Sequence, residues 1–100
     1  MNYVLEKPNA VIEVTPQAPG LFEVVLHNDD FTPMEFVIEA LREFFHLDEI
    51  VAKKITLDAH TKGEAVCGVY GKDVAESRID TAVEYARKHD HPLRWSMQGV

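Results

Sequence analysis

The sequence predicts an α+β domain in which three helices cover one side of a small, antiparallel, three-stranded sheet. Three segments place apolar residues at the three- and four-residue spacing of amphipathic helices. Three other segments are rich in β-branched residues or place apolar residues at every second position, as strands do. The order along the chain is strand, helix, helix, strand, helix, strand (β-α-α-β-α-β), and a helical layer on an antiparallel sheet accommodates this order.

The first strand is predicted over residues 21–27, because LFEVVLH is rich in apolar and β-branched side chains and ends at three polar residues, 28–30. The run EAVCGVYG at 64–71 predicts the second strand. The third is expected in residues 91–97, where HPLRWSM places Leu, Trp and Met at every second position. This two-residue period is typical of a strand with one buried face.

The start of the first helix is predicted by several residues together. Thr32 is placed as the N-cap and Pro33 as the first helical residue, and Glu35 completes a capping box with Thr32. Phe31 and Phe36 occupy the two positions of a hydrophobic staple. The apolar residues expected on the inward stripe of this helix are Met34, Val37, Ile38, Leu41 and Phe45.

The second helix is expected to open at Asp48 and to run to His60, and Gly63 can take the left-handed conformation that ends a helix. The third is expected to start at Asp73, with Glu76 three residues later repeating the capping pattern. The inward residues of these two helices are Ala52, Ile55 and Ala59, followed by Ala75, Ile79, Ala82, Val83 and Ala86.

Length and composition predict one domain with a terminal arm. One hundred residues suit a single core. Residues 1–20 contain prolines and a glycine without a sustained hydrophobic period, so we expect a flexible N-terminal arm and a folded domain over 21–100. No apolar run is long enough to cross a bilayer and no secretory signal is visible, which predicts a cytoplasmic protein with no membrane partner.

Charge and cysteine content exclude several classes of function. The net charge of −7, with no cluster of Lys and Arg, argues against nucleic-acid binding and favours a cationic partner or a free amine. Cys67 is the only cysteine, so an internal disulfide and a cysteine-based zinc cluster are excluded. Its apolar surroundings predict a small buried residue in place of a catalytic thiol.

The polar residues after the first predicted strand raise the question of a binding site. Asn28 and Asp29 follow the strand, and His60 is expected at the end of the second helix. If the sheet and helices bring the three to one rim, an amide oxygen, a carboxylate and an imidazole nitrogen offer three acceptors. An ammonium group has three donors, so a free α-amino group is a ligand that fits.

Other uses of these polar residues remain open at this point. Four legitimate metal ligands are His27, Asp29, Asp30 and His60. No HExxH or comparable pair anchors a metal, so no metal or other cofactor is expected. His60 also suits a surface or helix-capping histidine, and Met34 suits the core. No GxSxG motif occurs and no Ser or Cys is coupled to a base, which argues against nucleophilic catalysis.

Four blocks of sequence resemble one known family. In chain order, over about residues 21–98, they are LHNDDFTPMEFV, LREFFHLDE, LDAHTKGEAVCGVYGKDVAESRI and YARKHDHPL. They are similar to the ClpS family of adaptors, which hand N-degron substrates to Clp unfoldases of the ClpA type. The resemblance implies a fold of three strands and three helices, in agreement with the patterns above, and it implies no catalytic activity.

The resemblance also implies roles for individual residues. It assigns Asn28, Asp29 and His60 to the binding of the substrate's free α-amino group. The substrate's N-terminal side chain, which is Phe, Leu, Tyr or Trp in the family, would enter a pocket walled by Leu26, Asp30, Thr32, Met34, Val37, Thr56, Ala59 and Leu93. Asp73 and Arg78 match positions that contact the N-terminal domain of a ClpA- or ClpC-type unfoldase, the partner of the ClpP protease.

Two wall positions depart from the family pattern. Thr56 and Ala59 stand in TLDAH where typical members have Met and Val. Both residues are smaller, so we expect a wider or more polar pocket that also accepts Ile or Val. Protonation of His60 would place a positive charge beside the substrate's ammonium group, so binding is expected to weaken at acid pH.

Two alternative functions stand beside the adaptor. One is a small metal-dependent hydrolase that uses His27, Asp29 and His60. The other is a ribosome-associated module, since ribosomal stalk domains have a similar layer architecture. This last interpretation rests on fold analogy alone, and fold does not determine function.

Overall fold

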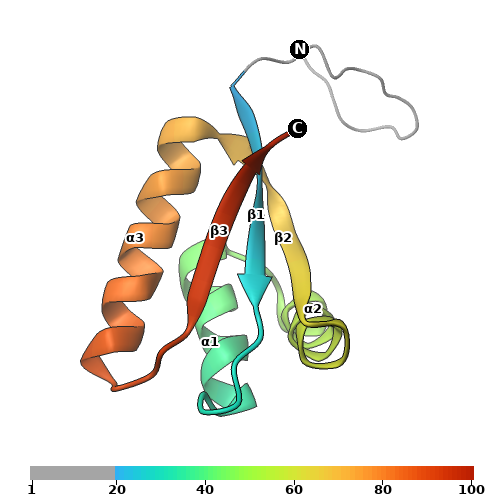
Figure 1. Cartoon of the computed structure of the whole chain (residues 1–100), viewed down its shortest axis with the longest axis vertical. Coiled ribbons are helices and arrows are strands. Elements are labelled where there is room, and N and C mark those ends of the chain that lie inside the picture. The colour runs from blue at the N-terminus through green and yellow to red at the C-terminus, as the bar shows by residue number, and fades with distance from the viewer. Residues whose placement is uncertain (1–19) are drawn as a thin grey trace.

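The computed structural model describes residues 20–100, so all but the last residue of the predicted flexible arm lies outside the described residues. Strands and helices follow one another in the predicted order, β-α-α-β-α-β (Figure 1). This confirms the α+β class with three antiparallel strands and three helices. The elements are β1 (Leu21–His27), α1 (Met34–Phe45), α2 (Glu49–Lys62), β2 (Glu64–Gly71), α3 (Lys72–Lys88) and β3 (Arg94–Gly99).

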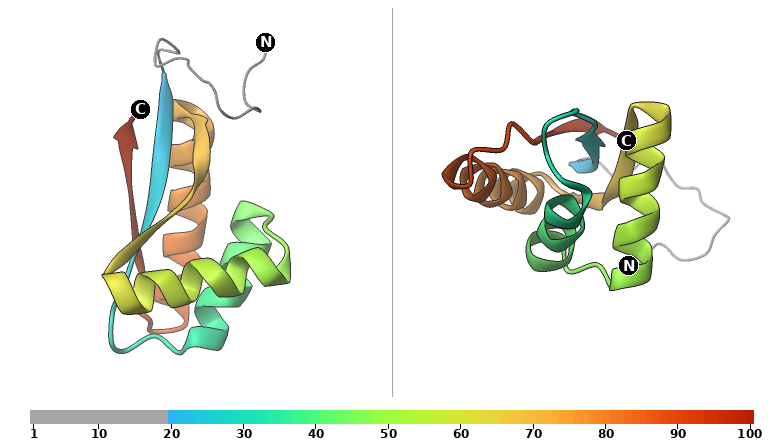
Figure 2. Two further views of the ribbon diagram at one scale, coloured as in Figure 1. Left: turned by 90° about the vertical axis from the view of Figure 1, so that its right-hand side faces the viewer. Right: turned by 90° about the horizontal axis from the view of Figure 1, so that it is seen from below.

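The sheet has β1 at its centre, with β2 and β3 paired antiparallel on either side of it. Figure 2 shows the helices on the same side of the sheet, with α2 crossing at the end where β2 begins. The β1–β2 register shifts between Val24 and Val25, which pair with Gly68 and Val66 and leave Cys67 between them as a bulge. None of the helices in residues 20–100 is long and apolar enough to cross a membrane.

The core lies between the sheet and the helices. Val24, Leu26 and Leu41 are the largest fully buried side chains, and the rings of Phe45 and Trp95 pack beside each other at 5.5 Å between centroids. Burial of each large apolar side chain contributes about 1.5–3 kcal/mol to stability. Because Leu26 is the last buried residue of β1, the core extends to the edge of the polar loop that follows.

Cys67 belongs to this core and has no disulfide partner. Burial raises the pKa of its thiol to about 12, so the thiol stays protonated at neutral pH. A protonated, buried thiol is a poor nucleophile and a poor metal ligand. The prediction of a small buried residue at this position is confirmed.

The start of α2 agrees with the prediction, and the helix ends at Lys62, two residues beyond the predicted His60. The Asp48 carboxylate accepts a hydrogen bond from the Val51 N–H at 2.9 Å and caps the helix. Gly63 ends it in the left-handed region (φ 95°), with its N–H donating to the Ala59 carbonyl at 2.8 Å. The predicted inward residues Ala52, Ile55 and Ala59 are buried.

The predicted start of α1 is wrong. The helix begins at Met34, after Pro33 in an extended conformation (φ −62°, ψ 143°). Thr32 does not cap it, because Pro33 is extended and stands between Thr32 and the first helical residue. The Thr32 N–H and hydroxyl instead donate to the carboxylate of Asp29, a charged acceptor that makes a strong hydrogen bond. Within the described chain, the capping box of Thr32 and Glu35 therefore does not form.

The hydrophobic staple before α1 is also wrong. Phe31 is 81% exposed, whereas Phe36 is half-buried and stacks on Tyr85 of α3 at 5.5 Å between ring centroids. The edge-on ring of His91 lies 4.4 Å from Phe36. Phe36 thus takes aromatic partners from distant parts of the chain in place of its sequence neighbour.

The cap predicted for α3 is wrong as well. The helix starts at Lys72 with Gly71 in the N-cap position, and Asp73 lies in the first turn. A negative charge there still stabilises the helix N-terminus through the helix dipole. The predicted inward residues of α3 are confirmed as members of the core or as half-buried neighbours of it: Ala75, Ile79, Ala82, Val83 and Ala86.

The last strand starts later than predicted, at Arg94. Pro92 has no N–H for a strand ladder. The N–H of His91 donates to the Ala86 carbonyl at 2.9 Å, at the end of α3, so His91 is held by the helix. The alternation from Leu93 onward is retained, since Leu93 and Trp95 are buried.

Candidate functional site

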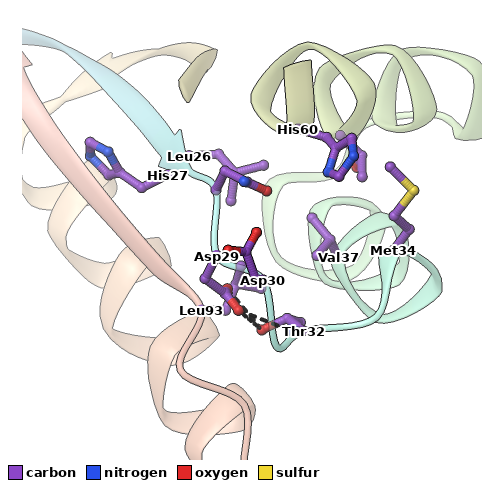
Figure 3. A pocket seen from close by; sticks show the side chains of 11 residues that line it. Leu26, His27, Asp29, Asp30, Thr32, Met34, Val37, His60 and Leu93 are labelled. Atoms are coloured by element: carbon purple, nitrogen blue, oxygen red, sulfur yellow. Dashed lines mark hydrogen bonds between the residues drawn. The ribbon is translucent and has the colours of Figure 1, made fainter. Parts of the chain in front are cut away.

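A cavity of about 140 Å³ opens at the end of the sheet where β1 stops (Figure 3). It is enclosed by the end of β1, the loop that follows, the first turns of α1, the last turns of α2 and the residue before β3. The residues that line it are Leu26, His27, Asn28, Asp29, Asp30, Thr32, Met34, Val37, Thr56, His60 and Leu93.

A backbone hydrogen bond joins the two sides of this cavity. The Asn28 N–H donates to the Gly63 carbonyl at 3.0 Å, just beyond the last residue pair of the β1–β2 ladder. Gly63 ends α2, and His60 lies in the last turn of the same helix. The bond therefore holds the helix end that carries His60 next to the loop that carries Asn28 and Asp29.

The predicted polar residues Asn28, Asp29 and His60 all line this cavity. Asn28 and His60 are exposed and Asp29 is half-buried, so solvent reaches this rim. Figure 3 shows His60 beside Met34 and Val37, with Asp29 across from them on the loop. An amide, a carboxylate and an imidazole thus border one opening, as the sequence analysis supposed.

Asp29 has most of its hydrogen-bonding capacity committed inside the loop. Its Oδ1 accepts from the Phe31 N–H and the Thr32 N–H, both at 2.8 Å. The Thr32 hydroxyl lies 2.8 Å from Oδ2 and 3.0 Å from Oδ1. A carboxylate has about four acceptor positions, so Oδ2 keeps one for a ligand.

The inner wall of the cavity is apolar. Leu26, Val37 and Leu93 are buried, while Met34 at the start of α1 is 36% exposed and stands at the mouth. An apolar cavity of about 150 Å³ is large enough for a benzene molecule. The cavity is therefore of a size that accepts one aromatic or large aliphatic side chain.

Thr56 lines the wall but does not offer its hydroxyl to a ligand. The residue is 4% exposed, and its Oγ1 donates to the Ala52 carbonyl one turn earlier at 2.8 Å. The hydrogen-bonding proton of the hydroxyl is thus used within α2. Of the two expectations for this position, the structure supports a smaller wall residue more than a more polar one.

Two residues are placed differently from the sequence assignments. Ala59 is 1% exposed and packs in the core, and among the described residues it is not part of the cavity lining. His27 is part of the lining, although the sequence analysis named it only as a candidate metal ligand and not as a pocket residue. Alternation along β1 directs its ring to the other face, where Nε2 is 2.6 Å from the Ser96 hydroxyl and Nδ1 is 3.7 Å from Glu64.

The geometry does not favour a metal centre. Figure 3 shows the His27 ring turned away from His60 and the cavity. In the part of the chain from residue 20 onward, no group of three His, Cys, Asp or Glu side chains is placed to hold a metal ion. The trio His27, Asp29 and His60 therefore does not converge on one point.

The two residues predicted to contact an unfoldase belong to α3. This helix starts at the end of the sheet opposite to the one where β1 stops (Figure 1). Asp73 is exposed in the first turn of α3, and the guanidinium carbon of Arg78 is 5.0 Å from the centroid of the Tyr70 ring. α3 starts where β2 ends, at Gly71, which pairs with Leu21, the first residue of β1. The length of β1 thus separates this surface from the cavity.

Acceptor side chains at the rim of an apolar cavity, in a small α+β domain, are typical of a binding protein. A comparison with known protein families matches residues 17–96 to the family described as ATP-dependent Clp protease adaptor protein ClpS. The chain belongs to the ClpS family of adaptors, which is non-enzymatic. The hydrolase interpretation is therefore wrong, and the ribosomal interpretation gains no support.

Individual relatives agree with this family. The chain is 46% identical over 90 residues to the ATP-dependent Clp protease adapter protein ClpS of Alkalilimnicola ehrlichii, covering 88% of this chain and 85% of that protein. It is 49% identical over 82 residues to the same adapter of Hydrogenovibrio crunogenus, covering 82% and 79%. Agrobacterium tumefaciens ClpS2 bound to L-phenylalaninamide superposes with a TM-score of 0.79 at 33% identity, over 82% of this chain and 99% of that one.

Replacement of Gly63 by Ala is expected to lower the free energy of unfolding by about 1–2 kcal/mol, because a side chain with a Cβ is strained in the left-handed region. No atom lies within 4 Å of the added Cβ, so the effect isolates the backbone conformation. Gly99→Ala is the matched control: its nearest atom would be Phe22 Cε2 at 3.9 Å, an ordinary contact. Urea denaturation measures both variants, and equal losses would contradict the role of Gly63 as the end of α2.

Proposed function

We propose that this cavity binds the first residue of a substrate protein, taking its free α-amino group at the rim and its large hydrophobic side chain inside. The observation that carries the proposal is the position of Asn28, Asp29 and His60 on the rim of one cavity with an apolar wall. The ligand of Agrobacterium tumefaciens ClpS2, L-phenylalaninamide, supports it, since that molecule has a free α-amino group and a benzyl side chain. Phe, Leu, Tyr and Trp are the side chains we expect.

The energetics suit recognition of a chain terminus. An ammonium group can donate three hydrogen bonds, and a hydrogen bond to a charged group contributes roughly 1.5–3 kcal/mol. Burial of the side chain adds about 1.5–3 kcal/mol. After the cost of association, micromolar or tighter binding, near or beyond about −8 kcal/mol, is consistent with these contributions.

The same argument explains why the terminus must be free. Acetylation removes the positive charge and two of the donors, and it adds bulk at the rim. The acceptors of Asn28, Asp29 and His60 would then be shielded from water without a partner.

Delivery to a protease uses a separate surface in this proposal. The Asp73 and Arg78 region would dock on the N-terminal domain of a ClpA- or ClpC-type unfoldase in the cytoplasm, which feeds ClpP. Its support is the position of α3, whose start lies at the opposite end of β1 from the cavity. Substrate and unfoldase can therefore be held at the same time.

Fluorescence anisotropy with a labelled peptide that begins with Phe tests the central proposal. We expect binding to this peptide, and at least about tenfold weaker binding to its N-acetylated twin and to a peptide that begins with Ser, because each lacks one of the two contributions. Addition of a chelator is expected to leave the affinity unchanged. Equal affinity for the three peptides would refute recognition of the N-terminal residue.

Pocket width is tested with peptides that begin with Leu, Ile or Val. We expect Thr56→Met to weaken binding of the Ile and Val peptides by about tenfold or more relative to Leu, because a longer wall side chain excludes β-branched ligands. Thr61→Met is the matched control: Thr61 is exposed on the same helix and likewise bonds a carbonyl one turn earlier, that of Leu57. If Thr56→Met leaves the selectivity unchanged, Thr56 does not determine the width of the pocket.

The docking surface is tested by reversing one charge. Asp73→Lys is expected to slow degradation of a Phe-initiated reporter by the cognate unfoldase and ClpP about tenfold or more, since like charges across an interface are costly. Glu76→Lys makes the same charge change on an exposed residue of the same helix and serves as control. Peptide affinity is expected to be unchanged in both. Normal degradation with Asp73→Lys would place the docking surface elsewhere.

A further inference from the structure

The carboxylate of Asp29 is held asymmetrically. Its Oδ1 accepts from two backbone N–H groups, those of Phe31 and Thr32, at 2.8 Å each. The Thr32 hydroxyl lies 2.8 Å from Oδ2 and 3.0 Å from Oδ1, and within the described chain it is the donor that reaches Oδ2. Oδ1 is thus held mainly by backbone donors, whereas Oδ2 is held by the Thr32 side chain.

This asymmetry gives the Thr32 hydroxyl a distinct effect. The two oxygens turn together about the Cβ–Cγ bond, so the backbone hydrogen bonds to Oδ1 already limit this torsion, which is otherwise broad for aspartate. The hydroxyl beside Oδ2 adds a third donor and narrows the remaining tilt of the carboxylate plane. The remaining acceptor position of Oδ2 then has a set direction before any ligand arrives, and recognition benefits when acceptors need no reordering on binding.

Thr32 is also well placed to serve this purpose without touching the amine. The residue is half-buried, it lines the cavity, and it stands three residues after Asp29 on the same loop. Its hydroxyl is not used to cap α1, because Pro33 follows in an extended conformation before the helix begins. The hydroxyl is therefore available for the carboxylate alone.

We propose that Thr32 is a positioning residue for α-amino recognition, which orients Asp29 Oδ2 toward the substrate's ammonium group. The inference rests on the proposed function. It assigns the selectivity for a free amine partly to a hydroxyl that does not itself contact that amine. Selectivity for the N-terminal side chain is assigned to the apolar wall and is independent of this hydroxyl.

The test compares two peptides with each variant: one that begins with Phe, and a twin in which 3-phenylpropionyl replaces Phe and removes only the amino group. The ratio of their affinities reports amine recognition, whereas a general loss of packing would weaken both alike. Thr32→Val removes the hydroxyl at nearly constant shape. We expect it to lower the ratio about tenfold to a hundredfold, which corresponds to loss of one charge-assisted interaction.

Thr32→Ser is the matched control, since it keeps the hydroxyl and removes the methyl group. We expect its ratio to stay within about threefold of the natural protein, even if its affinity for both peptides falls because a wall contact is lost. Recovery of the ratio by Ser and not by Val is the result that supports a positioning role. Circular dichroism and the thermal midpoint confirm that each variant is folded, and Thr32→Ala replaces Thr32→Val if the latter is not.

Two outcomes would overturn the inference. In the first, the ratio is unchanged in Thr32→Val, whether or not both affinities fall, which would leave Thr32 as a wall residue only. In the second, Thr32→Ser loses the ratio as fully as Thr32→Val. Failure of the proposed function is distinguishable, because the natural protein itself would then bind the two peptides equally.

Discussion

The candidate binding site depends on the backbone hydrogen bond from the Asn28 N–H to the Gly63 carbonyl, at 3.0 Å. It continues the β1–β2 pairing past the end of β1, so the last turn of α2 is tied to the first residues of the following loop. Gly63 makes this possible, because its left-handed conformation ends the helix and lets the chain return as β2. With those two backbones joined, His60 and Asp29 have little freedom to separate.

The central strand connects this site to the stability of the whole domain. Val24 and Leu26 are buried on the helical side of β1, and Leu26 is at once a core residue and the inner wall of the cavity. A pocket built on a central strand is rigid, because moving it would disrupt core packing. The same strand also separates the cavity from the start of α3, which suits the proposed function, in which substrate and unfoldase are held together.

Predictions of helix ends from sequence patterns were correct where no other side chain bound the groups involved. Asp48 caps α2 and Gly63 ends it, since both residues act on backbone groups within one turn. The same reasoning was wrong at Thr32, because extended Pro33 separates it from the helix and its N–H and hydroxyl bind the carboxylate of Asp29. It was also wrong for Phe36, because Tyr85 and His91 approach from other parts of the chain. Capping and staple rules consider only a few neighbouring residues in the sequence, so they do not account for such partners.

The sequence by itself determined the fold class, the order of the elements and the family, because periodicity and motif spacing record short-range preferences and shared ancestry. It also identified nearly all the residues around the cavity, through family resemblance. Only the tertiary structure decided that Asn28, Asp29 and His60 share one rim and that Ala59 packs in the core. It also decided that the hydroxyls of Thr56 and Thr32 donate to other groups of the protein. The physical reason is that these facts depend on sheet register and helix crossing, which place side chains from distant segments within hydrogen-bonding distance.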